Sequence, residues 1–234
     1  MASDWVFGIF VPLIGSILAN AMWCVPVQNT LNARKPDSKI ELEPIPFVVT
    51  VLNCMGWTLY SFLIMDPFVF SANAFGILVG LFNTTSYIML TADKNRESMI
   101  SNTEIGLLLA ASFWILLMLV LFFSSQSTDT ITTVVGICTC TITALYYCSP
   151  MANLLLTRNF ATIDVIYLPM GITNLICALT WTLYGAFGIG DIFVWLPNMI
   201  GTIASAILVS LKLIRMFVSK KQALASSATM HSIA

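Results

Sequence analysis

The chain has 234 residues, of which 58% are hydrophobic and only 9% are charged, whereas a soluble domain carries about 25% charged residues. So few charges cannot cover a water-exposed surface, and these numbers exclude a soluble globular protein. Ten Lys and Arg against eleven Asp and Glu give no basic field, so nucleic acid is not an expected partner. We conclude that the chain is an integral membrane protein whose surroundings are the lipid bilayer.

Seven apolar runs are each long enough to cross a bilayer, since a spanning helix takes roughly 20 apolar residues. The runs are continuous, unlike the alternating strands of a membrane barrel, and no basic segment before the first run indicates a cleaved signal peptide. The sequence therefore predicts an all-α fold with seven transmembrane helices. Their expected positions are residues 5–27, 45–65, 68–91, 105–124, 130–157, 166–187 and 192–211. The Ser- and Ala-rich segment from Lys220 onward is expected to be a mobile tail.

Basic side chains occupy every second connection between these runs. They are Arg34, Lys35, Lys39, Lys94, Arg96, Arg158, Lys212, Arg215, Lys220 and Lys221. The N-terminus and the other connections carry only the acidic residues Asp4, Asp66, Asp129 and Asp191. Because short loops rich in Lys and Arg stay cytoplasmic, we predict an outer N-terminus and a cytoplasmic C-terminus, which requires an odd number of spans. The plasma membrane is the expected location, with an intracellular membrane as the alternative.

An internal repeat recurs at an offset of 124 or 125 residues. The matching pieces are Trp57-Thr58-Leu59-Tyr60 with Trp181-Thr182-Leu183-Tyr184, Cys24-x-Pro26-x-x-Asn29 with Cys148-x-Pro150-x-x-Asn153, and Asn73-x-x-Gly76 with Asn198-x-x-Gly201. Three spans invert the exit side of a repeat, so one linker helix must return the chain before the second repeat starts. We therefore predict two parallel three-helix repeats. The expected division is a first repeat at 1–92, a linker helix at 93–128, a second repeat at 129–215 and a cytoplasmic tail at 216–234.

These motifs resemble the SWEET family of sugar facilitators over roughly residues 7–215. The most specific pieces are Asn53-Cys54 ahead of Trp57, the segment Leu196-Pro197-Asn198-Met199-Ile200-Gly201, and the prolines Pro26, Pro46, Pro150 and Pro169. The resemblance implies a two-repeat sugar transporter with pocket residues at the repeated Trp and Asn positions. It also implies a hinge or gate at the prolines on the cytoplasmic side, and a homo-oligomer of three chains.

Asp, Glu, Lys, Arg and His are missing from the interior of every predicted span. Ion-coupled transporters need such groups at membrane depth, and a hydrolase needs a nucleophile with a base. Cys138-x-Cys140 has no accompanying His or carboxylate, so a metal site is not expected there. The sequence therefore predicts neither an enzyme nor a protein with a metal or cofactor, but a passage for a neutral solute that moves down its own gradient.

Sugar recognition requires flat aromatic faces for C–H groups and amides for hydroxyls. Trp57 and Trp181 supply the first, and Asn73 and Asn198 supply the second. The predicted helix directions place all four at similar depths, slightly outward of the midplane, at 1.5 Å per helical residue. We predict that they line one sugar-binding cavity, with Cys54, one turn before Trp57, at its border.

Other side chains are candidates for gates or for structural bonds. Tyr60 and Tyr184 lie one turn outward of the tryptophans and are predicted to close an outer gate together with Asp191. The candidate inner hinge consists of Pro26 and Pro150 in the inner third of their helices, and of Pro46 and Pro169 near the starts of theirs. Asn53, Asn83 and Asn174 have no repeat partner and are expected to hydrogen-bond across helices.

The favoured function is that of a bidirectional sugar uniporter that works by alternating access. Two bulky indoles narrow the cavity, so a monosaccharide such as glucose is favoured over a disaccharide. Two alternatives stay open at this point. One is a proton-coupled amino-acid carrier of the related PQ-loop type, which usually needs a buried acid. The other is a non-transporting seven-helix receptor, which leaves the internal repeat unexplained.

Overall fold

The computed structural model describes residues 5–92, 97–157, 163 and 168–233, and seven helical segments within them are long and apolar enough to cross a membrane. This confirms the predicted all-α membrane fold. The elements are η1 (Val6–Phe10), α2 (Val11–Ala33), α3 (Pro44–Leu63), α4 (Pro67–Ala92), α5 (Glu97–Phe123), α6 (Thr128–Thr157), α7 (Leu168–Leu183), η3 (Tyr184–Gly188) and α8 (Ile192–Ile233).

Local sequence explains where several of these helices begin. Proline fits the first turn of a helix, because the N–H that it lacks has no partner there. Pro44 opens α3, and Pro67 opens α4. Directly before Pro67, Asp66 Oδ1 accepts the backbone N–H groups of Phe68 at 2.9 Å and Val69 at 3.0 Å, which caps the start of α4. The connection between α3 and α4 is thereby held tightly.

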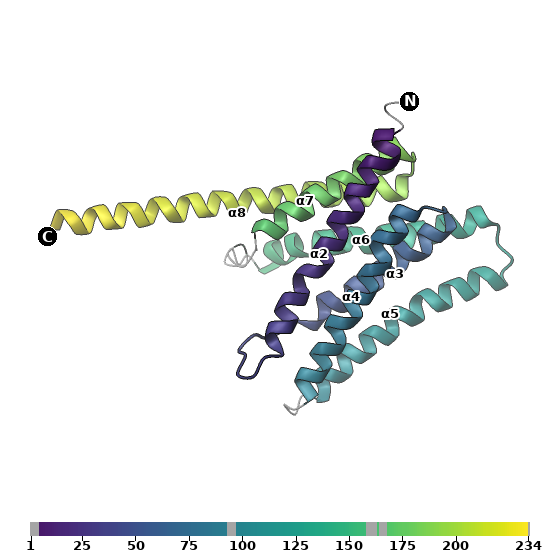
Figure 1. Ribbon diagram of the computed structural model, residues 1–234, viewed down its shortest axis with the longest axis horizontal. Coiled ribbons are helices and arrows are strands. Elements are labelled where there is room, and N and C mark those ends of the chain that lie inside the picture. The colour runs from purple at the N-terminus through teal and green to yellow at the C-terminus, as the bar shows by residue number, and fades with distance from the viewer. Residues whose placement is uncertain (1–4, 93–96, 158–162, 164–167, 234) are drawn as a thin grey trace.

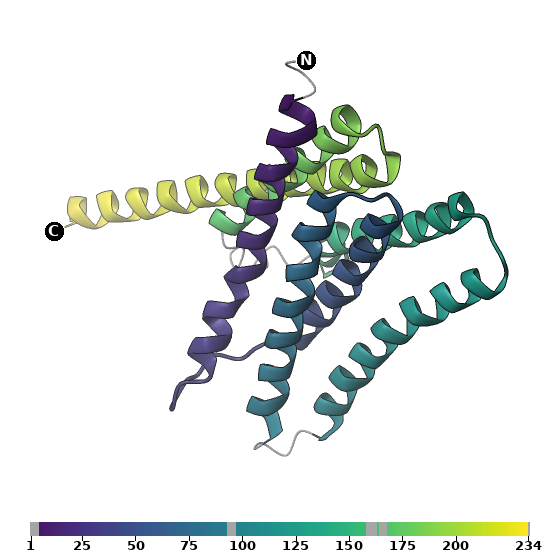
Figure 2. The same ribbon diagram turned by 45° about the vertical axis from the view of Figure 1, so that its right-hand side comes forward.

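Two halves of the chain repeat one packing order. In the first half α4 packs against both α2 and α3, and in the second half α8 packs against both α6 and α7. The halves meet crosswise, because α2 packs against α7 and α3 packs against α6. Helix α5 packs against α3 and α4 and so lies beside the first half (Figures 1 and 2). The space enclosed between the halves is where a site can form.

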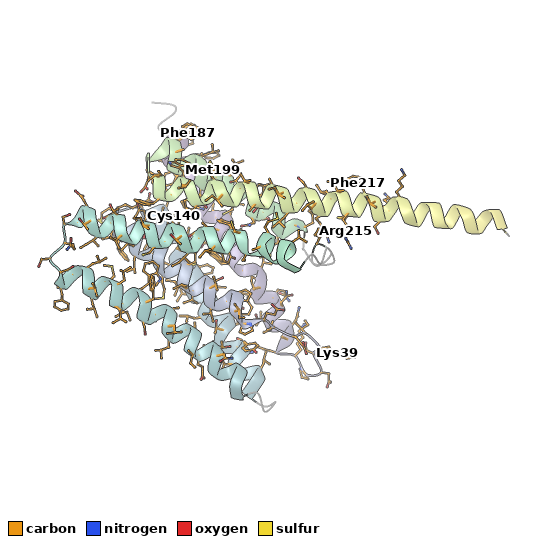
Figure 3. The ribbon with its side chains drawn as sticks, turned by 180° about the vertical axis from the view of Figure 1, so that it is seen from behind. Lys39, Cys140, Phe187, Met199, Arg215 and Phe217 are labelled. Carbon is orange, nitrogen blue, oxygen red and sulfur yellow. The ribbon has the colours of Figure 1, made fainter. Side chains whose placement is uncertain are left out.

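The helices converge at one end of the molecule and spread apart at the other. Figures 1 and 2 show the N-terminus near the α3–α4 and α7–α8 connections, whereas the opposite ends of the two halves diverge. In Figure 3, Phe187 lies at the converging end, and the basic residues Lys39 and Arg215 lie at the other end. The charge segregation found in the sequence is therefore also a segregation in space.

The last helix continues well beyond Lys220. Helix α8 has 42 residues, ends at Ile233 and runs beyond the other helices (Figure 1). After Lys220 the sequence contains no Gly or Pro and four Ala, the residue with the highest helix propensity. The segment is thus helical, and its mobility stays a prediction.

Helix α5 is fixed to the first half by one tryptophan. Trp114 is 1% exposed, and its Nε1–H donates to the Leu52 carbonyl at 2.8 Å. Its ring lies directly over Gly56 of α3, where an added Cβ would come within 2.4 Å of Trp114 Cζ2 and 2.9 Å of Thr139 Oγ1. Because neither neighbour is a flexible chain end, only glycine allows α3, α5 and α6 to approach this closely.

We expect Gly56→Ala to destabilise the protein by about 1–3 kcal/mol through overpacking against the indole. The measurement is the melting temperature of the purified protein in detergent. Gly8→Ala is the matched control, because no heavy atom lies within 4 Å of its added Cβ. Equal melting temperatures for the two variants would contradict the packing described for Trp114.

Candidate functional site

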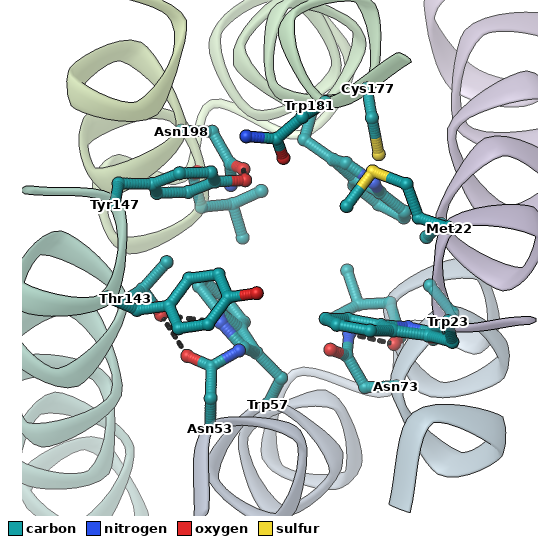
Figure 4. Close-up of a pocket in the computed structure, with 16 residues that line it drawn as sticks. Met22, Trp23, Asn53, Trp57, Asn73, Thr143, Tyr147, Cys177, Trp181 and Asn198 are labelled. Atoms are coloured by element: carbon teal, nitrogen blue, oxygen red, sulfur yellow. Dashed lines mark hydrogen bonds between the residues drawn. The ribbon is translucent and has the colours of Figure 1, made fainter. Parts of the chain in front are cut away.

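A cavity lies between the two halves, and its wall is formed by α2, α3, α4, α6, α7 and α8 (Figure 4). Its empty space, which includes open solvent at the mouth, is about 580 Å³, and about 60 Å³ of space is open to the centre of a water molecule. The lining residues are Ala19, Met22, Trp23, Asn53, Trp57, Val69, Ala72, Asn73, Thr143, Tyr146, Tyr147, Asn174, Cys177, Trp181, Val194 and Asn198.

The wall follows the internal repeat. Fourteen of the 16 lining residues form seven pairs at an offset of 124 or 125 positions. The pairs are Ala19/Thr143, Met22/Tyr146, Trp23/Tyr147, Asn53/Cys177, Trp57/Trp181, Val69/Val194 and Asn73/Asn198. In Figure 4 the labelled members of each pair face each other across the centre. The cavity therefore lies on the axis that relates the two halves.

All four side chains that the sequence predicts for a sugar site line this one cavity. Trp57 is 5% exposed and Trp181 is 7% exposed, so neither indole belongs to a belt at the membrane surface. The amides of Asn73 and Asn198 face the same space (Figure 4). The predicted co-localisation is thus observed, and a role in binding is a separate proposal below.

The two cavity asparagines are held in the same way. Asn73 Nδ2 donates to the Val69 carbonyl and Asn198 Nδ2 donates to the Val194 carbonyl, each at 2.8 Å and one turn earlier in the same helix. Each amide keeps a second N–H and a carbonyl oxygen. Tyr147 Oη donates to Asn198 Oδ1 at 3.4 Å. Two fixed amides with both donor and acceptor capacity therefore point into the cavity from opposite sides.

The repeated glycines Gly76 and Gly201 explain the placement of two aromatic rings that sequence reasoning missed. An added Cβ at Gly76 would lie 2.9 Å from Trp23 Nε1, and one at Gly201 would lie 2.6 Å from the Tyr147 ring. Each ring thus lies against a glycine of the third helix of its own half. Trp23 also donates to the Ala72 carbonyl at 2.9 Å. The signal in the sequence was the repeat offset, which pairs Trp23 with Tyr147.

The three unpaired asparagines do bond across helices, as expected. Asn83 Oδ1 accepts from Thr30 Oγ1 at 2.6 Å, and Asn174 Nδ2 donates to Ser205 Oγ at 3.0 Å. Asn53 Oδ1 accepts from Thr143 Oγ1 of α6 at 2.7 Å. Asn53 and Asn174 also line the cavity, which the sequence interpretation missed because it treated structural and lining roles as alternatives.

Cys54 does not lie at the cavity border where it was expected. It is fully buried behind the wall, and an added Cβ at Gly76 would come within 2.6 Å of its Sγ. Positions four apart share a helix face, whereas neighbours point about 100° apart. Because Asn53 and Trp57 occupy the cavity face of α3, Cys54 necessarily points away from it.

Two reciprocal hydrogen bonds join the halves at the converging end. Tyr60 Oη donates to Asp191 Oδ2 at 2.7 Å, and Tyr184 Oη donates to Asp66 Oδ2 at 2.5 Å. Asp191 Oδ1 accepts the N–H of Phe193 at 2.8 Å, as Asp66 does at the start of α4. Each carboxylate therefore caps the third helix of its own half and binds a tyrosine of the other half. We call these two bonds the tyrosine–aspartate latch; the sequence predicted three of its members and missed Asp66.

The latch packs directly on the cavity. The rings of Trp57 and Tyr60 meet edge to face with centroids 5.9 Å apart, and those of Trp181 and Tyr184 do so at 5.8 Å. A tyrosine of the latch therefore cannot move without disturbing the adjacent indole.

The four predicted hinge prolines occupy two kinds of position. Pro46 and Pro169 lie in the first turns of α3 and α7, where proline fits a regular helix start. Pro26 lies inside α2 and Pro150 lies inside α6. A proline cannot donate to the carbonyl four residues earlier, and those carbonyls belong to Met22 and Tyr146 of the cavity wall. The two helix-internal prolines thus weaken the backbone where the wall ends.

The fold and the site define a class of protein: an integral membrane protein with a neutral cavity between two related three-helix halves. The sequence pattern of the family described as "Sugar efflux transporter for intercellular exchange" matches residues 9–95 and 133–221. The chain belongs to this family.

Individual relatives are distant but cover most of the chain. The bidirectional sugar transporter SWEET7 of Arabidopsis thaliana is 26% identical over 82% of this chain and 74% of its own length. The sugar transporter SWEET1 of Dictyostelium discoideum is 22% identical over 89% of this chain and 92% of its own. The 3.7 Å structure of a eukaryotic SWEET transporter is similar in fold, with a TM-score of 0.78, 19% identity, and coverage of 92% of this chain and 98% of that chain.

A double-mutant cycle tests the latch. We expect Tyr184→Phe and Asp66→Ala to be strongly non-additive in stability, with a coupling of about 1.5–3 kcal/mol, because both remove the same charge-assisted bond. The measurement is thermal unfolding in detergent. The control cycle combines Asp66→Ala with Tyr60→Phe, which bonds to Asp191 instead, and should be additive. Equal coupling in the two cycles would contradict the reciprocal pairing.

Proposed function

We propose that this protein is a bidirectional uniporter for sugars, with a hexose such as glucose as its preferred substrate. The observation that carries the proposal is the cavity, which combines facing indoles with fixed amides. None of its 16 lining residues, all of which lie in the described part of the chain, is Asp, Glu, Lys, Arg or His. A cavity wall without acidic or basic side chains supports carriage of a neutral solute without ion coupling and gives no support to the proton-coupled alternative. The names of the relatives support a sugar as that solute.

In this proposal Trp57 and Trp181 cover the C–H faces of the sugar ring, and Asn73 and Asn198 hydrogen-bond its hydroxyls. The space open to the centre of a water molecule is about 60 Å³, so the walls leave little room beyond one sugar ring. This tightness supports a monosaccharide over a disaccharide. The protein makes or breaks no covalent bond in this role, and it needs no cofactor.

Alternating access would use the latch and the prolines. With the latch formed and the opposite ends of the halves apart (Figures 1 and 2), this conformation corresponds to a state closed at the converging end. Opening that end breaks two hydrogen bonds to carboxylates, each with a net contribution of about 1.5–3 kcal/mol. A uniporter requires both empty states to lie within a few kcal/mol, so contacts formed on closing the opposite end would offset this cost. Pro26 and Pro150 would let the inner ends of α2 and α6 swing.

The membrane placement is part of the proposal. We place the latch and the N-terminus outside and the basic, diverging end in the cytoplasm, because short Lys- and Arg-rich loops stay cytoplasmic. The plasma membrane is the proposed location, the division into repeats is that given by the sequence, and a trimer is the proposed assembly by resemblance to the family.

Glucose flux into proteoliposomes tests this function. We expect saturable uptake of radiolabelled glucose that is unchanged by a pH gradient, because no Asp, Glu, Lys, Arg or His lines the cavity. Trp57→Ala should lower glucose uptake at least about tenfold or admit larger sugars, since it removes one aromatic face. Trp5→Ala is the control, because Trp5 is 58% exposed and lies outside the cavity.

Unchanged glucose uptake by Trp57→Ala would contradict the proposed pocket. Uptake of amino acids stimulated by an inward proton gradient would favour the proton-coupled carrier, and the absence of any flux would favour a receptor.

Thiol labelling tests the proposed outer gate and orientation. In a variant that keeps Cys177 of the cavity wall and replaces every other cysteine by alanine, a membrane-impermeant maleimide added outside cells should react slowly. Adding Tyr60→Phe and Tyr184→Phe removes both bonds of the latch and should raise this rate several-fold. An unchanged rate, or fast external labelling without the tyrosine changes, would contradict a latch at the outer end.

A further inference from the structure

The repeat symmetry of the cavity is broken at two facing walls. One wall carries Asn53, Thr143 and Tyr146, and the repeat-related positions on the other wall carry Cys177, Ala19 and Met22. Figure 4 shows Asn53 and Thr143 on one side and Cys177 and Met22 on the opposite side. We call these the polar wall and the apolar wall.

The polar wall is a directed chain of hydrogen bonds. Trp57 Nε1 donates to Thr143 Oγ1 at 2.8 Å, and the Thr143 hydroxyl lies 2.7 Å from its acceptor Asn53 Oδ1. The carbonyl of Thr139, 2.8 Å from the same hydroxyl, competes for its one hydrogen. With its oxygen engaged by Thr143, the Asn53 amide presents Nδ2 to the cavity (Figure 4). This wall therefore offers a fixed N–H donor to a solute.

The three residues of the apolar wall carry no hydroxyl or amide, and the Cys177 thiol is only a weak donor and acceptor. Ala19 stands where the other wall has the Thr143 hydroxyl, so the indole of Trp181 rests on Gly15 instead, where an added Cβ would lie 3.1 Å from Trp181 Cε2. The thiol of Cys177, which also lines the cavity, lies 4.0 Å from the Gly15 carbonyl. A hydroxyl placed against this wall would lose its water without gaining a comparable partner.

The identical pairs cannot choose an orientation. Trp57 and Trp181, and likewise Asn73 and Asn198, are identical across the axis, so two solute poses related by a half turn contact them equally. Discrimination between these poses falls to the lining residues that differ across the axis, among them the two walls, the pair Trp23 and Tyr147, and the unpaired Asn174.

We propose that the walls bind the sugar in one orientation, with a hydroxyl-bearing edge on Asn53, Thr143 and Tyr146 and a C–H edge on Cys177, Ala19 and Met22. It follows that a hexose lacking a hydroxyl on the edge facing the apolar wall, a monodeoxy hexose, is a substrate as good as the parent sugar. This inference rests on the proposed function and specifies the substrate class of the same site.

The test is competition of the complete set of monodeoxyglucoses against radiolabelled glucose uptake in proteoliposomes. For the unmodified protein, we expect loss of a hydroxyl to raise the half-inhibitory concentration about five- to tenfold at one contiguous set of ring positions only. Asn53→Cys gives the polar wall the same residue that the apolar wall has at Cys177. It should abolish the rise in half-inhibitory concentration at those ring positions. Thr143→Val should do the same, because the hydroxyl that orients Asn53 is lost, whereas Thr143→Ser should keep the position dependence. Cys148→Ser, at an exposed side chain of the same helix, is the control.

The inference would be overturned if the half-inhibitory concentration rose equally for the loss of every ring hydroxyl, or if its dependence on ring position were unchanged in Asn53→Cys and Thr143→Val. In either case, glucose uptake by the unmodified protein would still support the proposed function. Absence of glucose uptake by the unmodified protein would overturn both. If Asn53→Cys does not fold, as judged by size-exclusion chromatography and its melting temperature, the comparison of Thr143→Val with Thr143→Ser tests the inference.

Discussion

The reciprocal hydrogen bonds of the tyrosine–aspartate latch connect the parts on which the rest of the structure depends. Asp66 starts α4, and Asn73 follows two turns later on the same helix, about 10 Å away at 1.5 Å per residue. In the other half, Tyr184 lies one turn from Trp181 and packs edge to face against it. The carboxylate that receives the tyrosine and the side chains that line the cavity are therefore fixed to the same short helical segments. A movement that breaks the latch therefore also moves side chains that line the cavity, which is the coupling that alternating access requires.

Duplication and divergence contribute differently to this protein. Both halves share the latch residues, the cavity indoles, the cavity amides and the glycines next to Trp23 and Tyr147. These shared features make the two sides of the cavity similar. The features that differ, at Asn53 and Thr143 above all, make the two sides of the cavity unequal, so that a bound solute has one preferred orientation. Because a membrane offers no water to satisfy a buried polar group, each such difference must be satisfied within the protein. The chain from Trp57 through Thr143 to Asn53 meets that requirement.

Sequence reasoning predicted the spans and the shared part of the site because bilayer thickness and repetition impose patterns that one chain displays. Seven apolar runs must match the hydrocarbon core, and repeated Trp and Asn positions must lie at equal depth. It missed the partner of Tyr184, because a hydrogen bond between residues 118 positions apart leaves no local pattern. It misplaced Cys54 because one residue of helical rotation separates the cavity face from the packed face. It did not predict that α8 continues as a helix beyond Lys220.

The most direct measurement of the central claim, that a neutral sugar is carried by alternating exposure of one cavity, is counterflow. Proteoliposomes preloaded with unlabelled glucose are diluted into a trace of labelled glucose, and the label inside is followed over time. The account predicts a transient accumulation of label above its equilibrium level, with the same size whether or not a proton ionophore is present. Monotonic equilibration without an overshoot would contradict a carrier with one alternating site, and an overshoot that disappears with the ionophore would contradict uncoupled transport.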